Sequence, residues 1–192
     1  MQEIGRGSSA TVYKGLYNFT EVAIKKLTVD SDDRALREFE REAITMAQLK
    51  HENILMLKGV NLEGKKYFVT EYCHGGSLFS LLHEGKNKHI NLSWKQKIKM
   101  MLDIAMGMYT MHVHKPSFIH RDLKSLNLLL QHQVNSEHDP VTVKVTDFGL
   151  SRTIEGSLQE LNEGFEFNAD KAMMMTGQAG TFHWMPPEIM LN

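Results

Sequence analysis

The sequence has one cysteine, few prolines, almost no net charge and no long apolar run, and each shortage excludes a class of protein. Because Cys73 is the only cysteine among 192 residues, an internal disulfide is excluded and a reducing compartment, the cytoplasm, is expected. The formal net charge of −1 gives no broad positive field for nucleic acid or an anionic membrane. No stretch approaches the roughly 20 apolar residues of a membrane span, so we expect neither nucleic acid nor a membrane span as a partner.

The residues that can carry chemistry gather in one stretch, residues 119–127, which reads I-H-R-D-L-K-S-L-N and is followed by three leucines. A solvated loop would not need so many apolar residues, and a core strand would not tolerate the charges. The pattern favours a rigid loop in which apolar residues hold polar groups around a site. A helix end with chance charges is the alternative. The polar members are Arg121, Asp122, Lys124 and Asn127.

A turn containing Gly5 and Gly7 lies near the N-terminus, between two strand-like runs. A dinucleotide-binding fingerprint requires a helix directly after its glycines, whereas T-V-Y follows here and Ala10 stands in the place of the third glycine. The pattern therefore argues against a Rossmann-type oxidoreductase. It favours a hairpin whose glycines let backbone N–H groups approach phosphates.

Residues 31–50 are predicted to form a helix with Ser31 as its N-cap. Glu42 falls on the apolar face of this helix, and an inward carboxylate is costly without a cationic partner. Lys25, in the strand-like run V-A-I-K, is the predicted partner. The alternative is a solvated Glu42 at the edge of the stripe. The apolar face consists of Leu36, Phe39, Ala43, Met46 and Leu49.

Two further strands are predicted at 51–60 and 66–72, which completes a five-stranded antiparallel sheet with one helix. The glycines after Cys73 mark a hinge, so we place a domain boundary between 1–72 and 73–192, with Ser77 capping a short helix to His83. Further elements are a helix at 93–112 with a capping box, and a hairpin of 128–130 with 141–146. One stripe of that helix is predicted to be core, a Met-rich partner groove being the alternative. The stripe consists of Trp94, Ile98, Met101, Leu102, Ala105, Met108 and His112.

Asp147 stands at the end of the second hairpin strand, before Phe148 and Gly149. Its carboxylate and the amide oxygen of Asn127 are ligands that a hard cation such as Mg²⁺ prefers. The chain from Asp147 to Glu188 then loses periodicity and is long for a loop inside a compact domain.

The chain resembles a protein kinase catalytic domain over essentially its whole length. The motifs that carry the resemblance are, in chain order, the glycine turn, V-A-I-K, the inward Glu42, H-R-D-L-K-S-L-N, D-F-G and P-P-E. Within that family the sequence resembles the tyrosine-kinase-like group of Ser/Thr kinases. This closer resemblance rests on Lys124, Ser125, Gly180-Thr181 and Trp184-Met185. The implied fold is α+β and two-lobed, with a five-stranded N-lobe sheet, one helix and a partial, mainly helical C-lobe. Ala10 and Pro186 depart from the family pattern.

The resemblance also implies roles for individual residues. Asp122 would orient and deprotonate a substrate hydroxyl, Lys124 would touch the transferred phosphate, and Lys25 with Glu42 would fix the phosphates of ATP. Asn127 and Asp147 would hold Mg²⁺. The nucleotide would further contact Ile4, Gly5, Gly7, Val12, Ala23 and Leu129, the residue Thr70 at the back of its pocket, and the backbone of Glu71 and Cys73. A column linking the lobes would consist of Met46, Leu57, His120 and Phe148.

The implied partners are protein substrates with Ser/Thr hydroxyls and an upstream activating kinase. We expect Arg121 to read a phosphate placed on Thr176, or next on Ser157, in the long segment, a disordered insertion being the alternative. The kinase pattern continues past residue 192 into helices that this sequence does not contain. The expectation is therefore a truncated kinase of low stability and turnover, the rival being a module that binds nucleotide or a partner without turnover.

Overall fold

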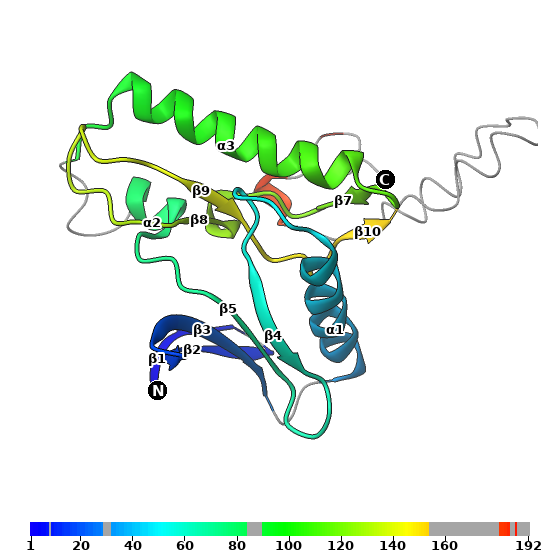
Figure 1. Cartoon of the computed structure of the whole chain (residues 1–192). Helices are drawn as coiled ribbons and strands as arrows, with labels where there is room; N and C mark the ends of the chain where they lie inside the picture. Colours follow the sequence, from blue (N-terminus) through cyan, green and yellow to red (C-terminus); the bar gives the residue numbers. More distant parts are fainter. Residues whose placement is uncertain (8, 29–31, 84–89, 154–180, 185–186, 188–192) are drawn as a thin grey trace, which may run out of the picture.

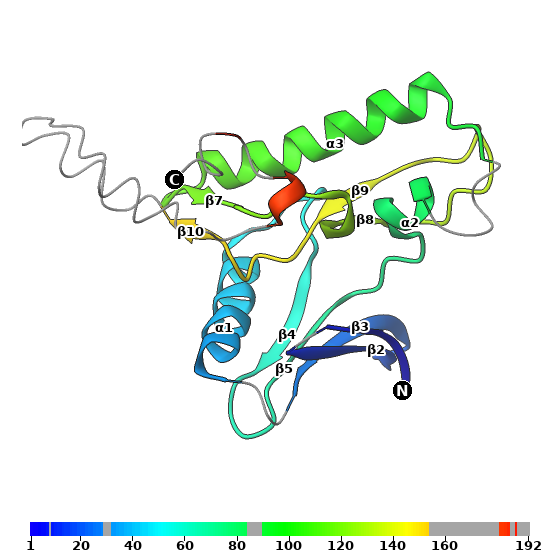
Figure 2. The same ribbon diagram turned by 180° about the vertical axis from the view of Figure 1, so that it is seen from behind.

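Two lobes make up the computed structural model, which describes residues 1–7, 9–28, 32–83, 90–153, 181–184 and 187 (Figure 1). The first lobe contains a sheet and the helix α1, and the chain passes into the second lobe after β5. In both views α3 runs along the outer side of the second lobe, with β8 and β9 between α3 and the first lobe (Figure 2). Within the described ranges, no helix has the length and apolar character needed to cross a membrane.

The N-lobe sheet has five antiparallel strands in the order β1-β2-β3-β5-β4, which confirms the predicted sheet. Asn18 and Phe19 connect β2 to β3 with positive φ angles of 48° and 59°, the geometry that suits the twist of a tight hairpin. The strands are β1 (Gln2–Arg6), β2 (Ala10–Tyr17), β3 (Thr20–Leu27), β4 (Leu57–Asn61) and β5 (Tyr67–Glu71).

Helix α1 (Asp33–Gln48) packs on this sheet through its predicted apolar face, and the rings of Phe39 and Phe68 lie 4.9 Å apart. The predicted N-cap was wrong by one residue. The Asp32 carboxylate accepts a hydrogen bond of 2.7 Å from the Ala35 N–H, whereas Ser31 lies outside the described residues. A carboxylate at this place also interacts favourably with the positive end of the helix dipole.

The strand predicted at 51–60 begins only at Leu57, because the chain before it is bonded to the other lobe. Asn53 donates through Nδ2 to the Val143 carbonyl at 3.0 Å, and its own carbonyl accepts from the Val145 N–H at 2.9 Å. The Leu55 N–H donates to the carbonyl of Val145 at 2.9 Å. These backbone groups are therefore not available to the N-lobe sheet.

Within the described ranges, the part of the C-lobe before residue 154 combines two helices with two small sheets. Ser77 caps α2 (Leu78–His83) by accepting from the Ser80 N–H, and the capping box of Ser93 with Gln96 opens α3 (Trp94–Val113), both as predicted. The sheets have the strand orders β6-β8-β9 and β10-β7, and the pairing of β8 with β9 confirms the predicted hairpin. The strands are β6 (Gly76–Ser77), β7 (Phe118–Ile119), β8 (Leu128–Leu130), β9 (Val143–Val145) and β10 (Arg152–Thr153), with short 3₁₀ turns at Ser125–Asn127 and Phe182–Trp184.

The face of α3 that is buried is not the face that was predicted. The Asp103 carboxylate accepts from the Val143 N–H at 3.0 Å, and Gln96 donates through Nε2 to two carbonyls at 2.9 Å each. A Cβ on Gly107 would lie only 2.7 Å from the Asn53 carbonyl oxygen, so glycine permits this close approach. The buried face consists of Gln96, Met100, Asp103, Gly107 and Met111.

The predicted stripe of α3 is instead largely exposed, with exposed fractions of 75% for Trp94, 56% for Ile98 and 54% for Leu102. Met101 and Tyr109 add to this apolar surface. A contiguous apolar patch on a helix favours association. We expect the chain to self-associate as its concentration rises, and the double change Ile98→Lys with Leu102→Glu to reduce association.

Light scattering over about a hundredfold range of concentration measures this effect. The matched control changes two exposed positions outside α3, Leu16→Lys and Phe19→Glu. If the chain stays monomeric throughout, or if both double variants act alike, the exposed face of α3 is not the cause.

Candidate active site

The carboxylate of Asp122 lies at the centre of the loop of residues 119–127 and is 7% exposed. Its Oδ2 lies 2.7 Å from the Lys124 ammonium and accepts from Asn127 Nδ2 at 3.0 Å. Its Oδ1 accepts from the backbone N–H and the hydroxyl of Thr181 at 3.0 and 2.8 Å, and Lys124 also donates to that hydroxyl at 2.5 Å. The structure therefore brings three of the predicted catalytic residues together and adds Thr181.

These contacts decide the charge of Asp122. Burial alone would raise its pKa, but hydrogen bonds from Lys124, Thr181 and Asn127 outweigh burial and hold the pKa below its ordinary value. The group is therefore an ionised carboxylate near neutral pH, which is the state that can accept a proton.

His120, in the same loop, is 1% exposed and holds the backbone of the loop in place. Its Nε2 lies 2.9 Å from the Thr146 carbonyl and its Nδ1 lies 3.3 Å from the Asp122 N–H. Only a neutral ring with its proton on Nε2 donates to the first and accepts from the second. Burial accordingly lowers the pKa of His120.

We expect the His120 ring to stay neutral from pH 8 down to below pH 6.5, the ordinary value. Because the unfolded chain binds this proton first, His120 contributes stability that is present above about pH 6.5 and is lost as the pH falls through its lowered folded pKa. Imidazole ¹⁵N shifts measured over a pH titration test this directly. Titration at or above the ordinary pKa, or a proton on Nδ1, would contradict the assignment.

The inward carboxylate of α1 does pair with the lysine of β3. Lys25 Nζ lies 2.6 Å from Glu42 Oε2 and 4.0 Å from Asp147 Oδ1. Glu42 is 4% exposed, so the solvated alternative is excluded. Burial raises the pKa of Glu42, and although burial opposes the charge on Lys25 as well, the carboxylates of Glu42 and Asp147 outweigh it and raise the lysine pKa. The pair presents a fixed ammonium beside Asp147.

Asn127 and Asp147 have the donor chemistry of a magnesium site. Both side-chain hydrogen bonds that Asn127 makes with described residues use Nδ2, which donates to the carbonyl and the carboxylate of Asp122. The amide oxygen of Asn127 therefore points away from Asp122. The Asp147 side chain is 45% exposed, and its backbone has a positive φ of 66°, which asparagine and aspartate tolerate better than most residues. Mg²⁺ typically takes one or two carboxylates plus phosphates and water, so this pair fits it.

The residues predicted to contact the nucleotide come from β1, β2, β3, β5 and β8 and from the segments that follow β1 and β5. Val12 pairs with Lys25 across β2 and β3, and Ala23 pairs with Thr70 across β3 and β5. Thr70 is buried and donates to the Glu71 carbonyl, while Leu129 is partly buried. Cys73 is 8% exposed, and burial raises the pKa of its thiol to about 12, so the thiol is not reactive near neutral pH. The glycine turn is exposed at Ile4 and Gly7, and the Gly7 N–H donates to the Ala10 carbonyl at 2.8 Å.

Members of the predicted column link the site to the core. Met46, His120 and Phe148 are at most 1% exposed, and the rings of His120 and Phe148 lie 5.4 Å apart. Leu57 is only partly buried.

Two further arginines, Arg41 and Arg152, lie close enough to Arg121 of the 119–127 loop for their charges to act on it. Burial lowers the pKa of Arg121, and the positive charges of Arg152 and Arg41 lower it further. Arg41 also donates to the Gly149 carbonyl at 3.1 Å. Arg121 has a positive φ of 69°, a backbone strain of the kind that functional sites store.

Sequence reasoning missed one buried charge near the nucleotide region. Lys144, 5% exposed, lies 3.0 Å from the Glu71 carboxylate and donates to the Glu52 carbonyl at 2.7 Å. The available signal was a lysine between two valines of a buried strand, where an unpaired charge would be costly.

Comparisons with known proteins agree with this geometry. The family described as "Protein tyrosine and serine/threonine kinase" matches residues 1–192. The chain is 40% identical over 191 residues to "RGS domain-containing serine/threonine-protein kinase A" of Dictyostelium discoideum, which covers 97% of this chain and 14% of that protein. It is 37% identical over 193 residues to "Probable serine/threonine-protein kinase SIS8" of Arabidopsis thaliana, covering 100% and 16%. It is 34% identical over 188 residues to "Stress-activated protein kinase alpha" of Dictyostelium discoideum, covering 98% and 26%.

The chain thus spans between about a seventh and a quarter of the length of these relatives. The family match, the fold and the grouping of Lys25 with Glu42 and of Asp122 with Lys124 and Asn127 all agree. The chain belongs to the protein kinase family.

Proposed function

We propose that this chain carries the catalytic residues of a Ser/Thr protein kinase, which transfers the γ-phosphoryl group of ATP to Ser or Thr hydroxyls of protein substrates. The observation that carries the proposal is the buried, ionised Asp122 bonded to Lys124, Asn127 and Thr181. The names of the relatives above, all Ser/Thr or stress-activated kinases, support the same reaction.

In this proposal the nucleotide lies between the lobes. Val12, Ala23 and Leu129 contact the adenine, and the backbone of Glu71 and Cys73 bonds its edge. Bound Mg²⁺, held by Asn127 and Asp147, would neutralise charge on the phosphates. Lys25, kept charged and in place by Glu42 at 2.6 Å, binds the phosphate oxygens.

Asp122 then orients the substrate hydroxyl and accepts its proton, while the hydroxyl oxygen bonds to the γ-phosphorus and the bond to the β-phosphate oxygen breaks. ADP and a phosphorylated Ser or Thr are the products. Lys124, 2.7 Å from Asp122, places a positive charge beside the transferred group. Because Thr181 occupies Oδ1 of Asp122, the substrate hydroxyl must share or replace one of its bonds.

Phosphoamino-acid analysis tests the proposal. The chain is incubated with Mg·ATP and a generic protein substrate, and an Asp122→Asn preparation purified in the same way controls for contaminating kinases. Phosphoserine and phosphothreonine that depend on Asp122 are expected. Predominantly phosphotyrosine would contradict the Ser/Thr assignment.

A second candidate is a module that binds nucleotide without turnover. The observation in its favour is that both oxygens of Asp122 already accept two hydrogen bonds each, with the Lys124 ion pair counted as one. Nucleotide binding together with no Asp122-dependent phosphate transfer would select this function.

We further propose that residues 1–72 and 73–192 act as the nucleotide-binding and catalytic parts, and that the cytoplasm is the site of action. The arginine group of Arg41, Arg121 and Arg152 would bind a phosphate that an upstream kinase adds to Thr176 or Ser157. These two residues lie outside the described part of the chain.

Phosphatase treatment is expected to lower the activity of the wild-type chain and to have little further effect on Arg121→Ala or Arg152→Ala. Thr176→Ala should behave like the dephosphorylated chain, and Ser157→Ala is the second choice. The exposed Arg34→Ala on α1 is the matched control, because its only described partner is Glu38 at 3.0 Å. Activity that does not respond to phosphatase, or a full response in Arg121→Ala, places the switch elsewhere.

A further inference from the structure

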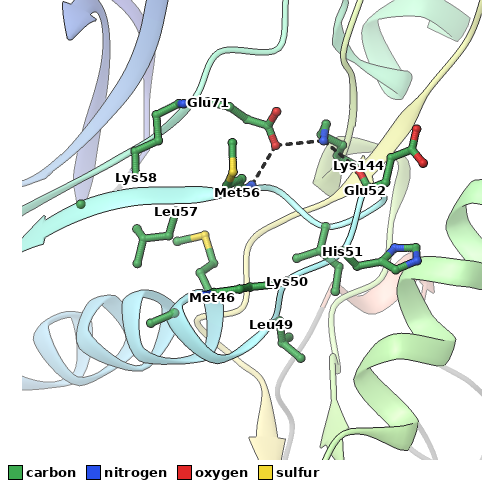
Figure 3. A pocket seen from close by; sticks show the side chains of 13 residues that line it. Met46, Leu49, Lys50, His51, Glu52, Met56, Leu57, Lys58, Glu71 and Lys144 are labelled. Carbon is green, nitrogen blue, oxygen red and sulfur yellow. Dashed lines mark hydrogen bonds and ion pairs between the residues drawn. The ribbon is translucent and has the colours of Figure 1, made fainter. Parts of the chain in front are cut away.

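A cavity of about 740 Å³ is lined by residues from the end of α1, the link from α1 to β4, the start of β4, the end of β5, and β9 (Figure 3). Apolar side chains of Met46, Leu49 and Leu57 form one side of it, and a charged group forms the other. This volume is within the range of small-molecule sites, which typically combine an apolar lining with a few polar groups.

The charged side is built on Lys144. Its ammonium donates to the Glu52 carbonyl at 2.7 Å and pairs with Glu71 Oε1 at 3.0 Å, and the same oxygen accepts from the Met56 N–H at 2.9 Å. A lysine ammonium has three donors, and described residues supply acceptors for two of them. A buried ammonium with donor capacity left favours a ligand that brings an acceptor.

The charge balance of the lining favours an anion. Besides the Lys144–Glu71 pair, the cavity is lined by Lys50, Lys58 and Glu52, together with His51. Neither Lys50 nor Lys58 has an ion pair with any residue in the described ranges. Among the lysines and glutamates of the lining, three positive charges face two negative ones.

We propose that this cavity binds a small free carboxylic acid with an apolar body, and that its occupancy changes nucleotide affinity. The apolar body packs against Met46 and Leu57, and the carboxylate lies among the lysines. Acid binding and nucleotide binding are coupled because the side chain of Glu71 lines the cavity, whereas the Glu71 backbone is proposed to bond the adenine. The binding stands on the cavity alone, whereas the coupling rests on the proposed function.

The site can be filled without removing any contact. Gly59 on β4 lines the cavity, and a Cβ at this position would meet no atom within 4 Å. Gly59→Phe should therefore occupy the space without clashing with the backbone. Val60→Phe, the next residue of the same strand and 46% exposed, is the matched control outside the cavity lining.

The experiment titrates the whole chain with 4-biphenylacetate and with the neutral 4-biphenylacetamide, followed by amide NMR shifts. A ligand of this size is expected to bind with a Kd of about 0.1–1 mM. We expect the acid to bind at least fivefold more tightly than the amide, and Gly59→Phe to weaken acid binding at least tenfold while Val60→Phe leaves it unchanged. Lys144→Met should reduce the preference for the acid to less than twofold, with circular dichroism confirming that each variant is folded.

Equal binding of acid and amide, equal binding to wild type and Gly59→Phe, or no binding to the folded chain would overturn the site. If an acetylated and amidated Phe-Asp-Leu tripeptide binds more tightly than 4-biphenylacetate, the proposal that the ligand is a small free acid is overturned. For the coupling, the acid must change the Kd of Mg·ADP by the same factor as Mg·ADP changes that of the acid, and no change would overturn it. Lys25→Met separates the two proposals, because it should weaken nucleotide binding more than tenfold while the variant that circular dichroism shows to be folded keeps acid binding.

Discussion

Replacing Asp122 by asparagine is expected to reduce phosphoryl transfer at least about a hundredfold, the scale of a lost general base. Asparagine keeps the shape of the side chain and can still accept through its oxygen, but it cannot take a proton from the substrate hydroxyl. Mg·ATP affinity should change less than about threefold, because Asp122 is proposed to act on the acceptor substrate. Initial rates with radiolabelled ATP and a generic protein substrate measure the effect.

Asp33→Asn is the matched control, since it makes the same chemical change at an exposed position in the first turn of α1. It should retain wild-type rates. If Asp122→Asn loses no more activity than Asp33→Asn, Asp122 is not the base.

Replacing Lys25 by methionine is expected to weaken Mg·ATP binding more than tenfold and to destabilise the fold. The change leaves Glu42, 4% exposed, without its partner at 2.6 Å. Breaking a buried ion pair on one side costs about 3 kcal/mol. This cost is at the lower end of the range for buried ion pairs, because the Lys25 side chain is 27% exposed to solvent.

The pH dependence identifies the cause. Without Lys25, the folded state favours a protonated Glu42, so its folded pKa lies above its unfolded value and the folded state binds more protons. The free energy of unfolding of Lys25→Met should therefore fall as the pH rises from 5 to 8. The double variant Lys25→Met with Glu42→Leu should lack this slope, and urea unfolding at several pH values measures both. Parallel pH profiles for the single and double variants would show that Glu42 is not the group responsible.

The parts of the fold that sequence predicted well depend on local chemistry. The capping box at Ser93 and Gln96 needs only residues three apart, and the antiparallel sheet follows from short strands joined by turns. The pairing of Glu42 with Lys25 was predictable because a carboxylate on an apolar helix face requires a cation.

The errors come from contacts between residues far apart in the chain. Helix α3 has apolar residues on more than one side, and its buried face was decided by Gln96 and Asp103, which bond backbone groups some 40 residues away. Residues 51–56 were predicted to be part of a strand, whereas Asn53 and Leu55 bond this segment to β9. The spacing of apolar residues along the sequence does not show which distant groups a segment will bond.

The site shows the same division. Motif residues around Asp122 were predictable, but the bonds of Thr181 to Asp122 and Lys124 join groups 59 and 57 positions apart. Lys144 belongs to no motif, and its partner Glu71 was considered only for its backbone.

The central claim is that Lys25, Glu42, Asn127 and Asp147 form a Mg·ATP site, and its most direct test is the melting temperature of this chain. A ligand that binds the folded state raises that temperature. ATP with Mg²⁺ should raise it more than ATP with EDTA in the wild-type chain, and Asp147→Asn should remove the magnesium-dependent part. Equal shifts with and without the metal, or no shift for a folded sample, would contradict the account.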